Sequence, residues 1–178
     1  MNSMPGRHLT KIPEPWLRGT NEGLPPVLRS VLHALELAKE DIDHWCGDLT
    51  DGQLNARPFG IESVSYHISH LARSLDRLLT YAEGRELSAA QLESLGSELA
   101  GGSSREEVFG EWNAAFQMAS RRLHASAGRD LNESRSVGRR QFQTTLGGLL
   151  MHIGDHTQRH VGQLITTVKI VKGSQREG

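Results

Sequence analysis

The stretch TLGGLLMHIGDHTQRHVGQLITTVKIV (residues 145–171) carries the clearest structural signal of the sequence. Its apolar residues recur with the 3.6-residue period of an amphipathic helix. The same stretch carries His152, His156 and His160 at successive four-residue steps. Residues four apart lie on one face of a helix, with Cβ atoms about 5–6 Å apart. The stretch therefore predicts a long helix that packs on a core and presents a row of imidazoles.

Three earlier segments repeat the helical period. The first begins at Pro25–Pro26, because proline suits the first turn of a helix, and Gly47 is its expected end. Gly84 is a natural cap for the second, and Ser104 with Glu107 predicts a capping box at the start of the third. The three segments lie at about residues 25–46, 61–82 and 104–127.

Four amphipathic helices predict an all-α protein, a four-helix bundle. We expect a loop at residues 48–60, a short helix near 89–95, a long polar connection at 128–143, and no strand. The glycines inside the last helix are expected to allow close helix packing rather than chemistry. They are Gly147, Gly148, Gly154 and Gly162.

The length of 178 residues fits one domain. Residues 1–20 contain several prolines and predict an extended lead-in, with Trp16 and Leu17 as its anchor on the body. The bundle is expected to span residues 21–172, and residues 173–178 are predicted to be a disordered tail.

Composition narrows the class of protein. With 20 basic and 21 acidic residues the net charge is -1, so no basic field favours nucleic acid. Cys46 is the single cysteine, which rules out an internal disulfide and favours a reducing compartment. Neither a signal peptide nor an apolar run of about 18 residues is evident, so we expect a cytoplasmic protein that does not bind membranes.

The histidine spacing is typical of a metal site. His67 and His70 lie on the second predicted helix, and a bundle can bring ligands from two facing helices together. Three protein ligands would leave coordination positions open, as in catalytic sites. The competing interpretation is that these histidines are ordinary hydrogen-bonded core residues. His8, His33, His44 and His124 are expected to be partly exposed or terminal and without a functional role.

The sequence does not contain the motifs of several other enzyme classes. The sequence has no G-x-S-x-G, H-E-x-x-H, P-loop or G-x-G-x-x-G pattern. Three neutral nitrogens suit Zn²⁺, Ni²⁺, Fe²⁺ and Cu²⁺ alike, and Mn²⁺ is a further candidate. Cys46 has no neighbour that marks a reactive thiol, and we expect it to be structural or on the surface.

Three segments resemble the DinB/YfiT-like family of four-helix-bundle proteins. They are LTDGQLNARPFG (49–60), VSYHISHLARSLDRLLTYAEG (64–84) and TTLGGLLMHIGDHTQRHVGQLITT (144–167). The resemblance implies up-down-down-up connectivity and one divalent ion, often nickel or zinc. By motif position it places the metal ligands at His70, His156 and His160. Val161 departs from the arginine that more commonly follows the last ligand, without altering the ligands.

The resemblance also implies what the site does. Relatives include transferases that use low-molecular-weight thiols and metal-dependent hydrolases, and many form homodimers. His67 and His152 lie one turn before predicted ligands and are our candidates for proton transfer or for holding a ligand in place. Asp155 and Gln163 could orient ligand imidazoles. The alternatives that stay open are a non-catalytic module stabilised by the metal and a stress-response dimer without metal.

Overall fold

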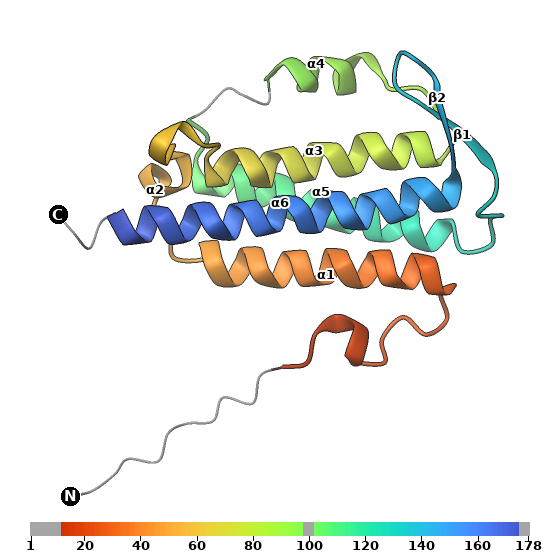
Figure 1. Cartoon of the computed structure of the whole chain (residues 1–178), viewed down its shortest axis with the longest axis horizontal. Coiled ribbons are helices and arrows are strands. Elements are labelled where there is room, and N and C mark those ends of the chain that lie inside the picture. The colour runs from red at the N-terminus through yellow and green to blue at the C-terminus, as the bar shows by residue number, and fades with distance from the viewer. Residues whose placement is uncertain (1–11, 98–101, 175–178) are drawn as a thin grey trace, which may run out of the picture.

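Four long helices lie side by side (Figure 1). The computed structural model of the chain describes residues 12–97 and 102–174. In Figure 1, α1 and α6 run in one direction and α3 and α5 in the other, which is the up-down-down-up order. Each of α1 and α3 packs against both α5 and α6. The predicted all-α class is confirmed. The helices are α1 (Pro26–Cys46), α3 (Val64–Ala82), α5 (Arg105–Ala125) and α6 (Leu146–Ser174).

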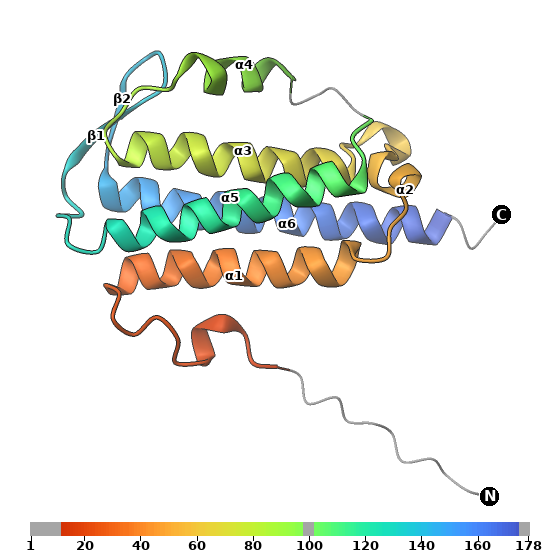
Figure 2. The ribbon, with the colours of Figure 1, turned by 180° about the vertical axis from the view of Figure 1, so that it is seen from behind.

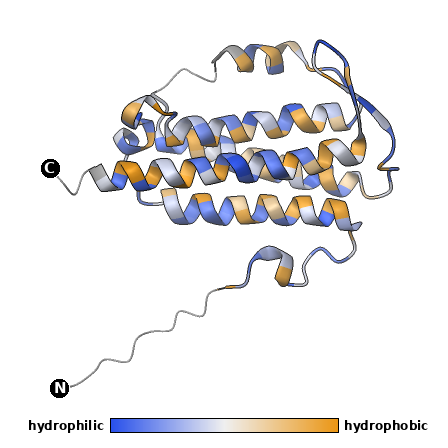
Figure 3. Ribbon diagram, in the orientation of Figure 1, coloured by the Kyte–Doolittle hydropathy of each residue, from blue (hydrophilic) through white to orange (hydrophobic). Residues whose placement is uncertain are grey.

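The four helices enclose one hydrophobic core. Each helix carries both hydrophobic and hydrophilic residues (Figure 3), and the apolar ones turn inward because of the helical period. Gly154 of α6 faces α1, but a Cβ there would lie in ordinary van der Waals contact, 3.7 Å from Cβ of Ala34, and a Cβ at Gly162 would meet nothing within 4 Å, so the packing does not require glycine at either position. The largest fully buried side chains include Leu28, Leu35, Ile42, Ile68, Leu71, Leu75, Trp112, Leu123, Leu146 and Leu150.

The predicted start of α5 has the expected cap. The Glu107 amide donates to Oγ of Ser104 at 3.3 Å, and the Ser104 amide donates to the Glu107 carboxylate at 2.8 Å. Both bonds satisfy backbone donors that the first turn would otherwise leave unpaired. The expected short helix is also present as α4 (Ala89–Ser97), which lies alongside α3 (Figures 1 and 2).

The segment predicted as a loop at residues 48–60 contains helix, so that prediction is wrong. It holds α2 (Asp51–Asn55) and a 3₁₀ turn, η2 (Pro58–Gly60). Thr50 and Gln53 form a capping box that starts α2, a signal present in the sequence. The next helix begins at Val64 rather than near residue 61, because the Ser63 hydroxyl caps it by accepting from the Tyr66 amide.

The connection at residues 128–143 is not strand-free, which corrects a second prediction. An antiparallel hairpin joins β1 (Ser134–Val137) to β2 (Phe142–Thr145) at one end of the bundle. Arg135 of this hairpin is buried, and its guanidinium donates to the Ala82 carbonyl at the end of α3, at 2.6 Å. The contact ties the hairpin to a helix end.

The predicted anchor of the lead-in is also wrong. Trp16 and Leu17 lie in a 3₁₀ turn, η1 (Pro15–Leu17), and are 63% and 58% exposed. The segment is instead held by Arg18, whose guanidinium pairs with Glu40 of α1 at 2.5 Å. Residues 1–11 and 175–178 lie outside the described residues, and so do most of the predicted tail and His8.

His33 does not have the expected exposure. It is buried, and Nε2 lies 3.2 Å from the Thr20 carbonyl oxygen of the lead-in. The lead-in therefore covers this side chain, an effect that the helix pattern alone does not contain. Among the described helices, none is both long and apolar enough to span a membrane.

Candidate metal centre

Three histidines from two antiparallel helices meet at one point. His70 projects from α3, and His156 and His160 project from α6. One ring nitrogen of each lies within 4.8 Å of the others. Nε2 of His70 is 3.1 Å from Nε2 of His156, and the ring centroid of His160 is 4.4 Å from that of His70 and 4.6 Å from that of His156.

The spacing of these nitrogens matches the needs of a transition metal. In a tetrahedral site with metal–nitrogen bonds of about 2.0–2.1 Å, ligand nitrogens lie roughly 3.3 Å apart. The three imidazoles are all half-buried, so each keeps part of its surface accessible. Hydrogen bonds between His70 and His156 and between His67 and His160 account for two pairs of rings, and a shared ion would explain why His70, His156 and His160 also approach one another. The donor set therefore fits one divalent ion.

Burial keeps part of this cluster neutral. Desolvation, followed by the charge of His160, lowers the pKa of His67 and of His156 from 6.5 to about 4. A buried imidazole loses the hydration of its charged form, and nearby histidines disfavour a second charge. The neutral ring is the form that binds a metal ion.

His67 lies behind one member of the cluster. It is buried, with 5% of its surface exposed, and Nδ1 lies 3.2 Å from Nδ1 of His160. One of these nitrogens carries the proton and the other accepts it. The bond occupies Nδ1 of His160, so Nε2 is the nitrogen that His160 can offer to an ion. This position fits a residue that holds another in place better than one that exchanges protons with solvent.

His152 lies at the outer rim. It is exposed, and its ring centroid is 5.5 Å from that of His156, one turn further along α6.

Tyr66, which the sequence analysis missed, stacks on His70 with centroids 5.6 Å apart and planes 17° from parallel. Its spacing of four residues before His70 was a usable signal.

The candidate orienting residues have other surroundings. Asp155 is exposed and forms an ion pair with Arg159, one turn along the same helix, rather than contacting a ring of the cluster. Gln163 is exposed as well. Among the described residues, His67 and Tyr66 contact rings of the cluster.

The family model of the DinB superfamily matches residues 34–164, well over half of the chain. The chain belongs to the DinB superfamily. The match contains all of His67, His70, His152, His156 and His160, so the family resemblance inferred from the sequence is confirmed over the site. A search of curated proteins gave no match to this chain.

Two openings reach the histidines of this DinB superfamily protein. The first, here named the polar groove, has a volume of about 750 Å³ and contacts the cluster at His67 and His160. The second, named the apolar pocket, has a volume of about 240 Å³ and contacts it at His70 and His156. The groove is further lined by Glu62, Tyr66, Arg159, Gly162, Gln163, Thr166 and Thr167.

The single cysteine of this DinB superfamily protein is remote from that chemistry. Cys46 ends α1, is fully buried and lines neither opening. Burial raises the pKa of its thiol from 9.0 to about 12. It is a structural thiol, and no nucleophilic sulfur comes from Cys46.

Proposed function

We propose that this DinB superfamily protein binds one divalent transition metal through His70, His156 and His160, and that it catalyses attack by a thiol or water on a small electrophilic molecule. The convergence of three imidazole nitrogens within 4.8 Å, from two different helices, carries the proposal. Zinc or nickel fits this all-nitrogen set, with iron, manganese and copper as alternatives.

The surroundings of the site support a catalytic role. Three protein ligands leave positions for other groups. An ion bound there lowers the pKa of a thiol or water that it holds and supplies a nucleophile near neutral pH. The polar groove, at about 750 Å³, falls within the range of small-molecule sites and offers polar side chains to a low-molecular-weight thiol. Because Cys46 is buried, the reacting sulfur would belong to that thiol.

The two neighbouring histidines take separate roles in this proposal. His67 keeps the His160 ring in one orientation through the bond between their Nδ1 atoms. His152, exposed beside His156, accepts the proton that the thiol or water loses and passes it to solvent. We further propose a homodimer that acts on small molecules rather than nucleic acid, in keeping with the net charge of -1.

Metal content tests the proposal first. Inductively coupled plasma mass spectrometry of the untagged protein should find about one transition-metal ion per chain. His156→Ala should lose the ion, and His152→Ala on the same helix should retain it. If the parent protein takes up neither zinc nor nickel, the metal site is refuted.

Catalytic turnover tests the second part of the proposal, the attack by a thiol or water on a small molecule. The metal-loaded protein should transfer thiols to electrophiles or hydrolyse small esters and amides, and His70→Ala should lose this activity while keeping its helical circular dichroism. Silence across both substrate classes would favour the alternative, a non-catalytic module. That alternative is supported by the origin of the ligands, because an ion shared by α3 and α6 would link two helices.

A further inference from the structure

The proposed reaction so far places no substrate in the apolar pocket. It contacts the histidine cluster at His70 and His156, whereas the polar groove contacts it at His67 and His160. A site for a two-part reaction needs a place for each reactant. The other walls of the pocket are Ser74, Arg77, Leu78, Tyr81, Leu87 and Leu95, and His152 lies at its edge.

The volume and lining residues of this pocket limit which small molecule can bind in it. A cavity of about 150 Å³ with apolar walls accommodates benzene, so a volume of about 240 Å³ holds one ring with a short arm. Three leucines give such a ring apolar walls, and Tyr81 adds an aromatic one. Arg77 is 7% exposed, and a guanidinium beside a ring is a favourable neighbour.

We propose that the apolar pocket binds an aromatic ring of the electrophilic substrate and directs the reactive group on its short arm toward the His70–His156 end. The thiol or water then approaches from the polar groove. This inference rests on the proposed function, since it gives that reaction its second substrate: a small aromatic electrophile.

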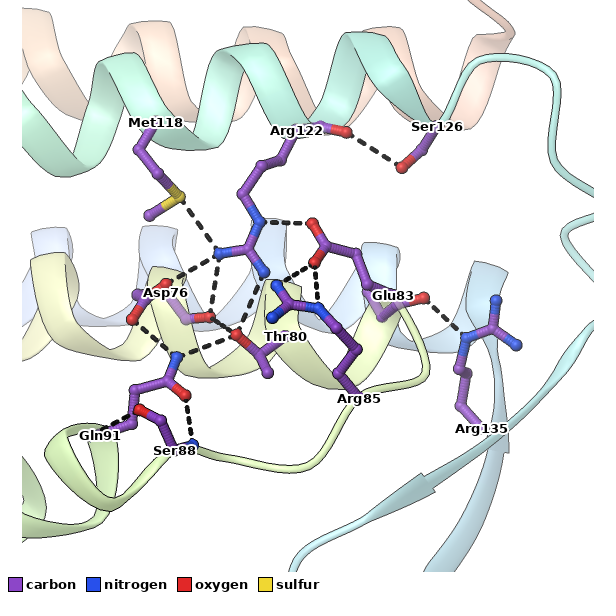
Figure 4. A network of polar contacts seen from close by, with 11 residues as sticks. Asp76, Thr80, Glu83, Arg85, Ser88, Gln91, Met118, Arg122, Ser126 and Arg135 are labelled. Carbon is purple, nitrogen blue, oxygen red and sulfur yellow. Dashed lines mark hydrogen bonds and ion pairs between the residues drawn. The ribbon is translucent and has the colours of Figure 1, made fainter.

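One wall of the pocket belongs to α4 and is held in place by a polar network (Figure 4). The Gln91 amide donates to the Asp76 carboxylate at 2.7 Å and to the Thr80 hydroxyl at 2.9 Å, which fixes α4 on α3. Leu92 and Leu95 are similarly exposed, at 43% and 47%, yet only Leu95 lines the pocket. The pair therefore provides a test residue and a matched control.

Two hydroxamates that differ only by a phenyl group test the inference on the zinc-loaded full chain. Acetohydroxamate reports binding at the metal site, and phenylacetohydroxamate adds the ring. Isothermal titration calorimetry should find about tenfold tighter binding of the phenyl compound, a gain typical of filling an apolar pocket. Leu95→Ala should reduce that gain by about threefold, whereas Leu92→Ala should leave it unchanged.

Each result separates this inference from the proposed function. If zinc is not taken up, the metal site is refuted, and the inference with it. If zinc is taken up but neither hydroxamate binds, the metal site stands, and the open coordination positions that the proposed reaction needs are refuted together with the inference. If both hydroxamates bind equally well, the metal site stands and the aromatic pocket is refuted. A gain that Leu95→Ala leaves unchanged would also refute it, because the ring would then lie elsewhere. Equal affinity of a cyclohexyl analogue would overturn the preference for an aromatic group.

Discussion

Nδ1 of His67 lies 3.2 Å from Nδ1 of His160, so a buried histidine of α3 shares a hydrogen bond with a proposed ligand of α6. Hydrogen bonds to the second ring nitrogen fix the tautomer and orientation of metal-binding histidines. In the proposed metal site this relationship gives His67 a positioning role, so its removal should weaken metal binding without removing a ligand.

His67→Ala should lower zinc affinity by about 10–100-fold, the usual effect of losing a partner behind a metal ligand. Competition with a chromogenic chelator measures the change. His67→Gln, which keeps a donor and an acceptor, should recover part of the loss. His44→Ala alters an exposed histidine of α1 and should have no effect. Unchanged affinity in His67→Ala would refute the positioning role.

Chelation should lower the melting temperature. Zinc at about 100 times its dissociation constant adds roughly 2.7 kcal/mol to the native state. For a chain of this size that corresponds to about 5–10 °C. Calorimetry with zinc and with excess chelator measures the shift, which should vanish in His156→Ala. A parent protein that holds zinc yet melts at one temperature in both conditions would contradict a site that links α3 to α6.

Local patterns explain how much of the fold could be predicted. The helical period, and the cap formed by Ser104 and Glu107, depend only on residues close together in the chain. Four helices could therefore be predicted from the sequence. The hairpin does not, because β1 and β2 are short and polar, and one of its contacts, Arg135 with the Ala82 carbonyl, lies 53 residues away in the chain. Burial of His33 by the lead-in depends in the same way on a distant segment.

In the candidate site, too, the features set by neighbouring residues could be predicted and those set by helix packing could not. The spacing along α6 predicted which histidines share a face, and the facing helix supplied His70. The distinction between His67, which is buried behind the cluster, and His152, which is exposed at its rim, arises only when α3 and α6 pack. The apolar pocket likewise needs α4 in place, and α4 is positioned by side-chain bonds of Gln91.

Cys46 should resist alkylation in the native protein. Burial raises the pKa of its thiol from 9.0 to about 12, which reduces the reactive thiolate about a thousandfold at neutral pH. Mass spectrometry after treatment with N-ethylmaleimide should find no adduct in the native protein and complete labelling in urea. Cys46→Ala should keep any thiol-transfer activity. Rapid native labelling would contradict the buried position and reopen Cys46 as a nucleophile.

Glu133 should give the protein a characteristic acid sensitivity. Arg129 and Arg135 donate to its carboxylate at 2.5 and 2.6 Å and lower its pKa from 4.5 to about 2. A carboxyl with a depressed native pKa stabilises the fold above its unfolded pKa, and this contribution is lost as the pH falls through the native value. The stabilisation should therefore be complete above about pH 5 and decline between 4.5 and about 2.

Urea unfolding of the parent protein and of Glu133→Gln across this pH range measures the contribution directly. The variant should be less stable at pH 7. The difference should shrink as the pH falls from 4.5 toward 2, because the carboxyl of the unfolded parent is protonated in this range while the native one is protonated only near pH 2. Arg129→Met removes one of the two partners of Glu133. In this background, the stability difference caused by Glu133→Gln should change less with pH. The Glu133 carbonyl accepts from the Leu146 amide at the start of α6, a bond that the side-chain substitution leaves in place. A constant difference from pH 7 to pH 3 would show that the substitution acts through packing rather than through the ion pair.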